Sequence, residues 1–281
     1  MKIKQIINKN AAFLLFLLAG ATACEGLEET VTIDVGQTER RLVIDGLILD
    51  ELTDQYVRLT WNTGFYSNEV QTLSGASVLV EDDAGNSWNL TESASEPGMY
   101  QATFEGQRGT TYNLSVNVEG QLYQASETLQ AVTEIDSLGW RIDFDEFDDP
   151  DEEGEFYEVL LYANEPQDSK DFYLFQFYRN GELQNEGFDE VYFTDDEFLQ
   201  ERIDGIPTGY YYALGDTVVV EIYSITSNAF VFYGDLLNSL TNDGGMFSPI
   251  PANLRNNLSN GAIGYFRASA VERDTIVVKE D

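Results

Sequence analysis

The sequence contains no histidine and a single cysteine in 281 residues. Without histidine the chain has no Ser-His-Asp or Cys-His nucleophile, no imidazole general base and no histidine-ligated zinc, copper or haem. One cysteine excludes an intramolecular disulfide, a thiolate zinc cluster and an iron–sulfur site. These absences remove the commonest catalytic and metal centres, and they favour a binding function over catalysis.

Basic residues are also scarce: 15 Lys and Arg stand against 50 Asp and Glu, for a formal charge of −35. A surface this acidic repels phosphate backbones, so nucleic acid is excluded as a partner. The simplest interpretation of the charge is solubility in a salty exterior. Hydrophobic residues make up 43% of the chain and aromatic residues 13%. That composition is sufficient for a packed core, so the charge does not indicate disorder.

The chain has no hydrophobic run long enough for a membrane-spanning helix. Its longest apolar run near the N-terminus, residues 11–19, follows Lys2, Lys4 and Lys9. Nine residues fall well short of the ~20 that a helix needs to cross a bilayer. Positive residues before a short apolar segment are typical of a secretory signal peptide, which we place at residues 1–23.

The only cysteine directly follows this segment, in the order Ala21-Thr22-Ala23-Cys24. This motif resembles a bacterial lipobox, in which the cysteine is acylated and becomes the first residue of the mature protein. Several acyl chains, at ~0.8 kcal/mol per buried CH₂, hold a protein on a membrane without crossing it. We therefore expect Cys24 to be lipidated and the mature protein to be held on a membrane without crossing it.

Residues 24–40 are polar and predict a tether. The acidic residues Glu25, Glu28 and Glu29 resemble, in short form, a surface-export signal of Bacteroidota-type lipoproteins, so we expect the protein to face the cell exterior.

Beyond the tether, residues 41–132 show the alternation of apolar and polar side chains that is typical of strands. Tyr112, Leu114, Val116 and Val118 form one apolar face in the clearest case, and Glu119-Gly120 predicts a tight turn directly after it. Strands are expected near 41–49, 56–61, 76–81, 86–91, 99–104, 111–118 and 121–128. Seven short strands at this spacing predict an immunoglobulin-like or transthyretin-like β-sandwich.

Residues 133–281 predict a second, aromatic-rich β domain with one amphipathic helix. Residues 172–178 are apolar on both faces, which predicts a central strand, and Asn180-Gly181 predicts a hairpin turn after it. Apolar residues at helical spacing predict a helix at about 228–241, capped by Ser227. Further strands are expected at 156–162, 217–226, 262–268 and 275–278. The fold class is therefore all-β and mainly antiparallel.

The order of these segments resembles the DUF4249 family of Bacteroidota lipoproteins. The most specific match is the stretch of residues 247–278, through Pro251, Asn253, Asn260, Gly261, Gly264, Tyr265 and Phe266. The resemblance implies an outer-membrane or cell-surface lipoprotein, often encoded beside a TonB-dependent receptor and acting in nutrient uptake. It implies no catalytic residues. A separate explanation for Gly264 is structural, since a glycine lets the backbone pack closely beside aromatic side chains.

An acidic loop is the candidate metal site. Asp149, Asp151 and Glu153 have the spacing that begins a calcium-binding loop. Leu160 stands where a helix–loop–helix site needs a bidentate glutamate, so only a looser structural calcium site remains, and a solvated acidic loop is the alternative. No other cofactor is expected.

Two further patterns concern ligands. Tyr210, Tyr211 and Tyr212 lie between glycines and suggest a loop platform for sugar rings or hydrophobic ligands, with an edge-strand or inter-domain contact as the alternative. Carboxylate pairs suffice for glycoside hydrolysis, but 50 acidic residues make such pairs unavoidable.

We therefore expect a non-enzymatic, surface-exposed lipoprotein that serves as an accessory or ligand-capture partner of a TonB-dependent transporter. The alternative is a structural or adhesive module that binds glycan or a neighbouring protein, and a carboxylate hydrolase is the third candidate.

Overall fold

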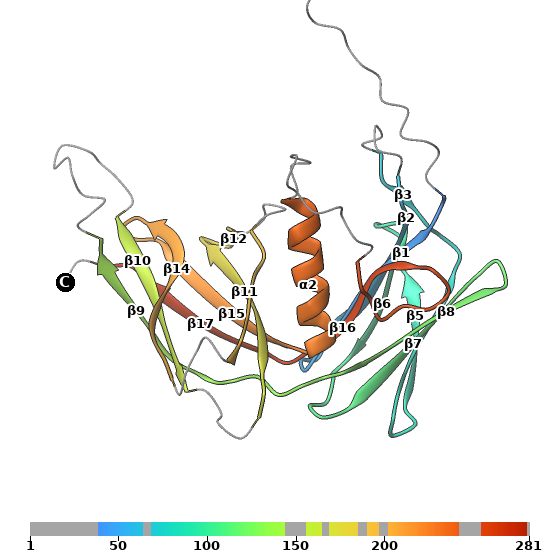
Figure 1. The fold of residues 1–281 in the computed structure, drawn as a ribbon, viewed down its shortest axis with the longest axis horizontal. Coiled ribbons are helices and arrows are strands. Elements are labelled where there is room, and N and C mark those ends of the chain that lie inside the picture. The colour runs from blue at the N-terminus through green and yellow to red at the C-terminus, as the bar shows by residue number, and fades with distance from the viewer. Residues whose placement is uncertain are drawn as a thin grey trace, which may run out of the picture. The chain divides into compact units, whose positions relative to one another are not determined.

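The computed structural model describes residues 39–63, 69–143, 156–164, 169–184, 190–196, 202–241 and 254–279. These residues belong to one compact unit that begins at Glu39. They form strands and one helix, α2 (Ser227–Leu240) (Figure 1). The strands are β1 (Leu42–Leu49), β2 (Thr53–Trp61), β3 (Gln71–Thr72), β4 (Ser77–Asp82), β5 (Ser87–Glu92), β6 (Met99–Phe104), β7 (Thr111–Val118), β8 (Gln121–Thr128), β9 (Ile135–Ile142), β10 (Tyr157–Asn164), β11 (Phe172–Arg179), β12 (Glu182–Leu183), β13 (Tyr192–Asp195), β14 (Arg202–Tyr212), β15 (Thr217–Ile225), β16 (Ile263–Ser269) and β17 (Val271–Val277).

The first sheet contains nine of the described strands, in the order β16-β1-β2-β6-β5-β4-β7-β8, with β3 paired to β2. Every predicted strand between residues 41 and 128 is present, and the alternation in β7 is confirmed: its four apolar side chains are buried. The strands form one hydrogen-bonded path, because β5 pairs with both β4 and β6. The predicted all-β, mainly antiparallel class is confirmed.

The first sheet is completed by a strand from the far end of the sequence. β16 pairs in parallel with β1, and Ile44 lies opposite Gly264. The segment before β16 reaches the opposite edge of the same sheet, where the backbone N–H of Ser259 donates to the Gln124 carbonyl at 2.8 Å. The backbone N–H of Gln124 in turn donates to Ser259 Oγ at 2.7 Å. Residues 254–269 therefore bring the two edges of the sheet, β16 and β8, close to each other.

The remaining described strands form two smaller sheets, ordered β14-β10-β9 and β12-β11-β15-β17, with β13 also paired to β11. β11 lies between β15 and the short strands β12 and β13, as predicted for a central strand. Asn180 and Gly181 both have positive φ, at 53° and 87°, which confirms the predicted hairpin turn.

A buried glutamine organises the turn between β1 and β2. Gln55 is 1% exposed; its Oε1 accepts from the backbone N–H of Leu49 at 2.7 Å, and its Nε2 lies 2.7–3.0 Å from the carbonyls of Leu49, Glu51 and Phe104. This turn contacts the C-terminal strands: Asp50 accepts from the backbone N–H of Val271 at 2.9 Å.

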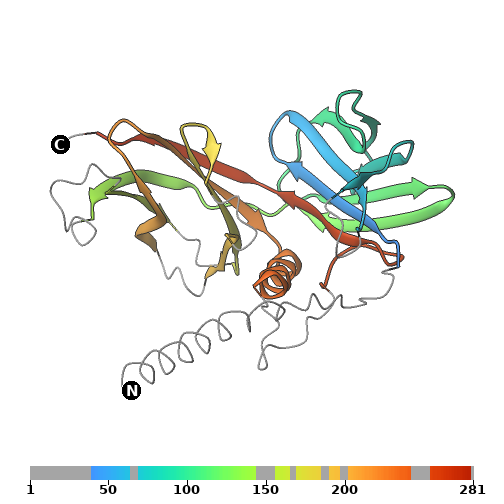
Figure 2. The same ribbon diagram turned by 90° about the horizontal axis from the view of Figure 1, so that it is seen from above.

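Helix α2 begins one residue earlier than predicted and has a different cap. Thr226 has extended backbone angles, and its hydroxyl accepts from the backbone N–H of Ala229 at 3.3 Å. The expected cap, Ser227, is already helical, because the extended conformation that a cap needs falls on the residue before it. The helix lies beside β15 and β16 (Figure 2). Within the described part of the chain, no helix has the length and apolar character needed to cross a membrane.

Candidate functional site

Two of the predicted sites lie outside the described residues: the lipidation site Cys24 and the acidic loop of Asp149, Asp151 and Glu153. Among the residues that the structure describes, no three His, Cys, Asp or Glu side chains are grouped so that they could hold a metal ion. The structure therefore leaves calcium binding by residues 149–153 as a prediction from sequence.

The tyrosines expected in a loop are part of strand β14 instead. Tyr210, Tyr211 and Tyr212 end this strand, so their side chains alternate between its two faces. Tyr212 is fully buried, while the exposed Tyr211 donates its hydroxyl to Asp143 at 2.9 Å. The flanking glycines, Gly209 and Gly215, suggested a loop, but Gly209 falls within the strand with a φ of 83°, and only Gly215 lies in the turn that follows it. Three rings that alternate in this way do not form a single platform.

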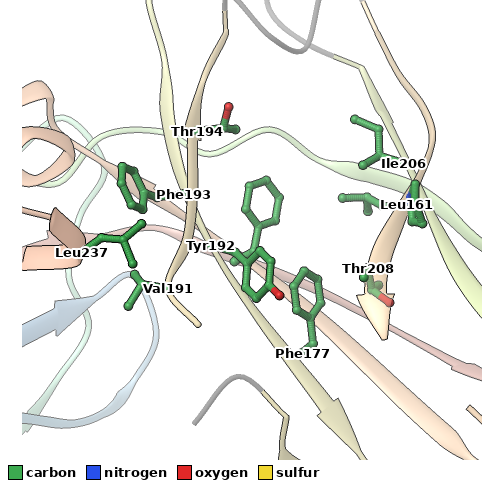
Figure 3. Close-up of a pocket in the computed structure, with 12 residues that line it drawn as sticks. Leu161, Phe177, Val191, Tyr192, Phe193, Thr194, Ile206, Thr208 and Leu237 are labelled. Atoms are coloured by element: carbon green, nitrogen blue, oxygen red, sulfur yellow. The ribbon is translucent and has the colours of Figure 1, made fainter. Parts of the chain in front are cut away.

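A different aromatic surface lies nearby, between the second and third sheets. It is an open groove of about 480 Å³ lined by β11, β13, β10, β14 and the end of α2. Figure 3 shows Phe177, Tyr192 and Phe193 on one side of it and Leu161 and Ile206 on the other. We call it the apolar groove. Its volume lies within the ~300–1,000 Å³ that is usual for ligand pockets.

The walls of the apolar groove are held in place by ring contacts. The centroids of Phe177 and Tyr192 are 5.7 Å apart in an edge-to-face arrangement, and Tyr210 lies 5.8 Å from Phe177 and 5.9 Å from Tyr192. Such pairs add ~0.5–1.5 kcal/mol each beyond the burial of their area. Tyr192 and Ile206 are nevertheless 39% and 41% exposed. The aromatic wall is thus ordered, and its apolar surface is open.

The apolar groove offers a few hydroxyl groups in an otherwise apolar lining. Among the described residues that line it there is no acid, base or thiol, and the side-chain hydroxyls are those of Tyr192, Thr194 and Thr208. Burial, followed by the neighbouring Tyr192, raises the pKa of Tyr210 well above its usual value, so this phenol stays neutral. A site of this kind takes an apolar group and offers it a few hydroxyl contacts.

Comparison with known families identifies the chain. A family model described as a domain of unknown function, DUF4249, matches residues 28–275. The chain belongs to the DUF4249 family. Comparison with curated proteins gave no match. The matched region contains the whole apolar groove, so the groove is part of the DUF4249 domain and not an addition to it.

The strand that forms one wall of the groove was predicted from the sequence, and the strand that forms the opposite wall was not. The run at residues 172–178 was predicted as a strand covered on both sides, and Phe175 and Phe177 of that run line the groove. The opposite wall, Ile206 to Gly209, carries a proline and a glycine, which argue against a strand in sequence. β14 accommodates them because it lies at the edge of its sheet, where its pairing with β10 is interrupted twice.

Proposed function

We propose that this protein is a non-catalytic, lipid-anchored binding protein of the outer membrane that faces the cell exterior and works beside a TonB-dependent transporter. The observation that carries the proposal is the apolar groove, whose described lining residues present an ordered aromatic surface. In this role the groove holds an apolar part of the transported ligand or of the transporter itself.

The anchor is tested by replacing Cys24 with serine. Serine cannot form the thioether that attaches the lipid, so we expect the variant to lose its acyl mass and its recovery in the outer-membrane fraction. A single acyl chain gives only marginal membrane binding, so loss of all chains has a large effect. Because Cys24 is the only cysteine, the change disturbs no disulfide. Mass spectrometry and membrane fractionation measure the outcome, and unchanged outer-membrane recovery would contradict the anchor.

The groove is tested by placing a charge on its rim. We expect the full-length wild-type chain to co-purify with a barrel protein from solubilised outer membranes, and Ile206→Lys to reduce that recovery severalfold. A lysine at this position puts an ammonium group beside aromatic and aliphatic side chains, and burying it under a ligand or partner is costly. Quantitative mass spectrometry of the co-purified proteins gives the readout.

The matched control is Leu214→Lys, because Leu214 is 47% exposed, close to the 41% of Ile206, and does not line the groove. This variant should retain the partner. Equal loss from both variants would mean that added positive charge, and not the groove, reduces the association. Recovery of the wild-type chain without any barrel protein would overturn the transporter partnership.

A further inference from the structure

A second pocket, of about 270 Å³, lies between α2 and the outer face of the first sheet. The pairing of the strands shows where the polar residues around this pocket lie. Asp45 on β1 lies opposite Arg58 on β2 and beside Tyr265 on β16. Two residues further along β1, Leu47 lies opposite Tyr56 and beside Arg267. Side chains two residues apart share a face, and Ile44 and Ile48 occupy the buried face, so all six residues project from the other face.

The arginines of this surface differ from all the others in the described residues. Six arginines there form ion pairs with carboxylates: Arg108, Arg141, Arg179, Arg202, Arg255 and Arg273. Arg40 and Arg41 donate hydrogen bonds to Gln71 and to the carbonyl of Gly261. Of the ten described arginines, only Arg58 and Arg267 have side chains that form neither a hydrogen bond nor an ion pair. In a chain with 50 acidic residues, two such arginines on one face are unexpected.

Arg267 is held in place by an aromatic ring and not by a direct ion pair. Its guanidinium lies over the ring of Tyr223, 5.0 Å from the centroid, and its Nη1 is buried with no hydrogen-bond partner. A guanidinium nitrogen that is buried without a hydrogen bond is costly, and an anionic partner that reaches it removes that cost. The stacked ring fixes the orientation of the planar group, which suits bidentate recognition of a carboxylate.

We propose that this pocket binds the carboxylate of a small organic acid, with Arg267 as the anchoring residue. Among the described residues that line the pocket, hydrogen-bond donors predominate: Arg267 and the hydroxyls of Tyr56 and Tyr233 share it with a single carboxylate, Asp45. Phe232 and Leu236 of α2 and Leu47 of β1 supply apolar walls for the body of the acid. The volume is slightly below the usual range of ~300–1,000 Å³, so the acid is small.

Asp45 limits the affinity of this pocket for anions. Burial raises the pKa of Asp45, and Arg267 and Arg58 act in the opposite direction without cancelling the increase. While ionised, Asp45 repels an incoming carboxylate; once neutral, it donates a hydrogen bond to it. An Asp45→Asn variant should therefore bind the acid more tightly. The described residues that line this pocket are all different from those that line the apolar groove, so this proposal does not depend on the proposed function.

The test uses the full-length chain in lipid nanodiscs, with titration calorimetry and empty nanodiscs as the blank. Three probes share one skeleton: 3-phenylpropanoate carries a carboxylate, phenethylamine an ammonium group, and phenylalanine both. Inorganic phosphate is the fourth probe. We expect 3-phenylpropanoate to bind in the millimolar range or tighter, phenylalanine more weakly, and phenethylamine and phosphate not measurably.

Arg267→Gln should weaken the binding of 3-phenylpropanoate roughly tenfold or more, because it removes charge-assisted hydrogen bonds to the carboxylate. Arg141→Gln is the matched control; it removes the same charge from an exposed ion pair on β9 and should leave the affinity unchanged. If Arg267→Gln does not fold, Asp45→Asn carries the test through its expected gain in affinity. No binding of 3-phenylpropanoate, equal binding by Arg267→Gln, equal binding of phosphate, or tighter binding of phenylalanine would each overturn the proposal.

Discussion

Replacing Gly264 with alanine is expected to destabilise the protein by roughly 2–6 kcal/mol, because the substitution adds backbone strain to a steric clash. A Cβ atom at this position would lie 2.1 Å from the carbonyl oxygen of Ile44, which is backbone and cannot rotate away. The φ of Gly264 is also +102°, a conformation that costs ~1–3 kcal/mol in a residue with a side chain. Since domains are stable by only ~5–15 kcal/mol, the variant should be marginal or unfolded. Urea denaturation followed by circular dichroism measures the change.

Gly85→Ala separates the two causes. Gly85 also has positive φ, at 89°, but nothing lies within 4 Å of a Cβ built on it. This variant should lose only the ~1–2 kcal/mol of the left-handed conformation. If Gly264→Ala proved no more destabilising than Gly85→Ala, the close approach of β16 to β1 at Ile44 would be wrong.

Gln55→Leu should cost about 3–5 kcal/mol of folding free energy. Leucine keeps the volume of the side chain, but it removes the partner of the Leu49 N–H and the hydrogen bonds that Nε2 gives to the carbonyls of Glu51 and Phe104. The carbonyl of Leu49 keeps its bond from the N–H of Gly106. Each buried polar group that loses its hydrogen bond costs ~1–3 kcal/mol. The total is smaller than the sum, because a carbonyl near the surface accepts a hydrogen bond from water instead. Chemical denaturation measures the loss of unfolding free energy, and the midpoint temperature of thermal unfolding should fall as well.

The control is Gln124→Leu, the same substitution at an exposed position on β8. We expect a change of at most ~0.5 kcal/mol there. A small effect at both positions would mean that the turn between β1 and β2 does not depend on Gln55. Because that turn also positions Asp50 and Glu51 against Val271 and Arg273, the loss at Gln55 should extend to the C-terminal strands.

Local patterns predicted most of the strands correctly, for a physical reason. In β7 the buried and exposed residues alternate without interruption, so the sequence itself carries the strand period. The turns at Glu119-Gly120 and Asn180-Gly181 each place a glycine at a position of positive φ, and Asn180 also tolerates that conformation. Where the local preference and the final environment agree, the sequence alone was sufficient.

The failures occur where the environment is built from distant segments. β14 contains Gly205, Pro207 and Gly209, residues that local rules assign to loops, and only its edge position beside β10 makes the strand favourable. The parallel pairing of β16 with β1 has no local signal at all. For the same reason neither pocket could be predicted, since each is lined by elements that meet only in the folded chain.

The parallel pairing of β1 with β16 also determines when the first sheet can be finished. Arg41, at the start of β1, donates to the carbonyl of Gly261, 220 residues further along the chain. During synthesis or export, β1 and its hairpin partner β2 emerge early, and one side of β1 then presents unpaired N–H and C=O groups until almost the last residues arrive. An open strand edge is a site for pairing with other chains. A chain stopped before residue 263 would thus keep this edge of β1 open to other chains, and delivery of the intact C-terminus is a condition for closing it.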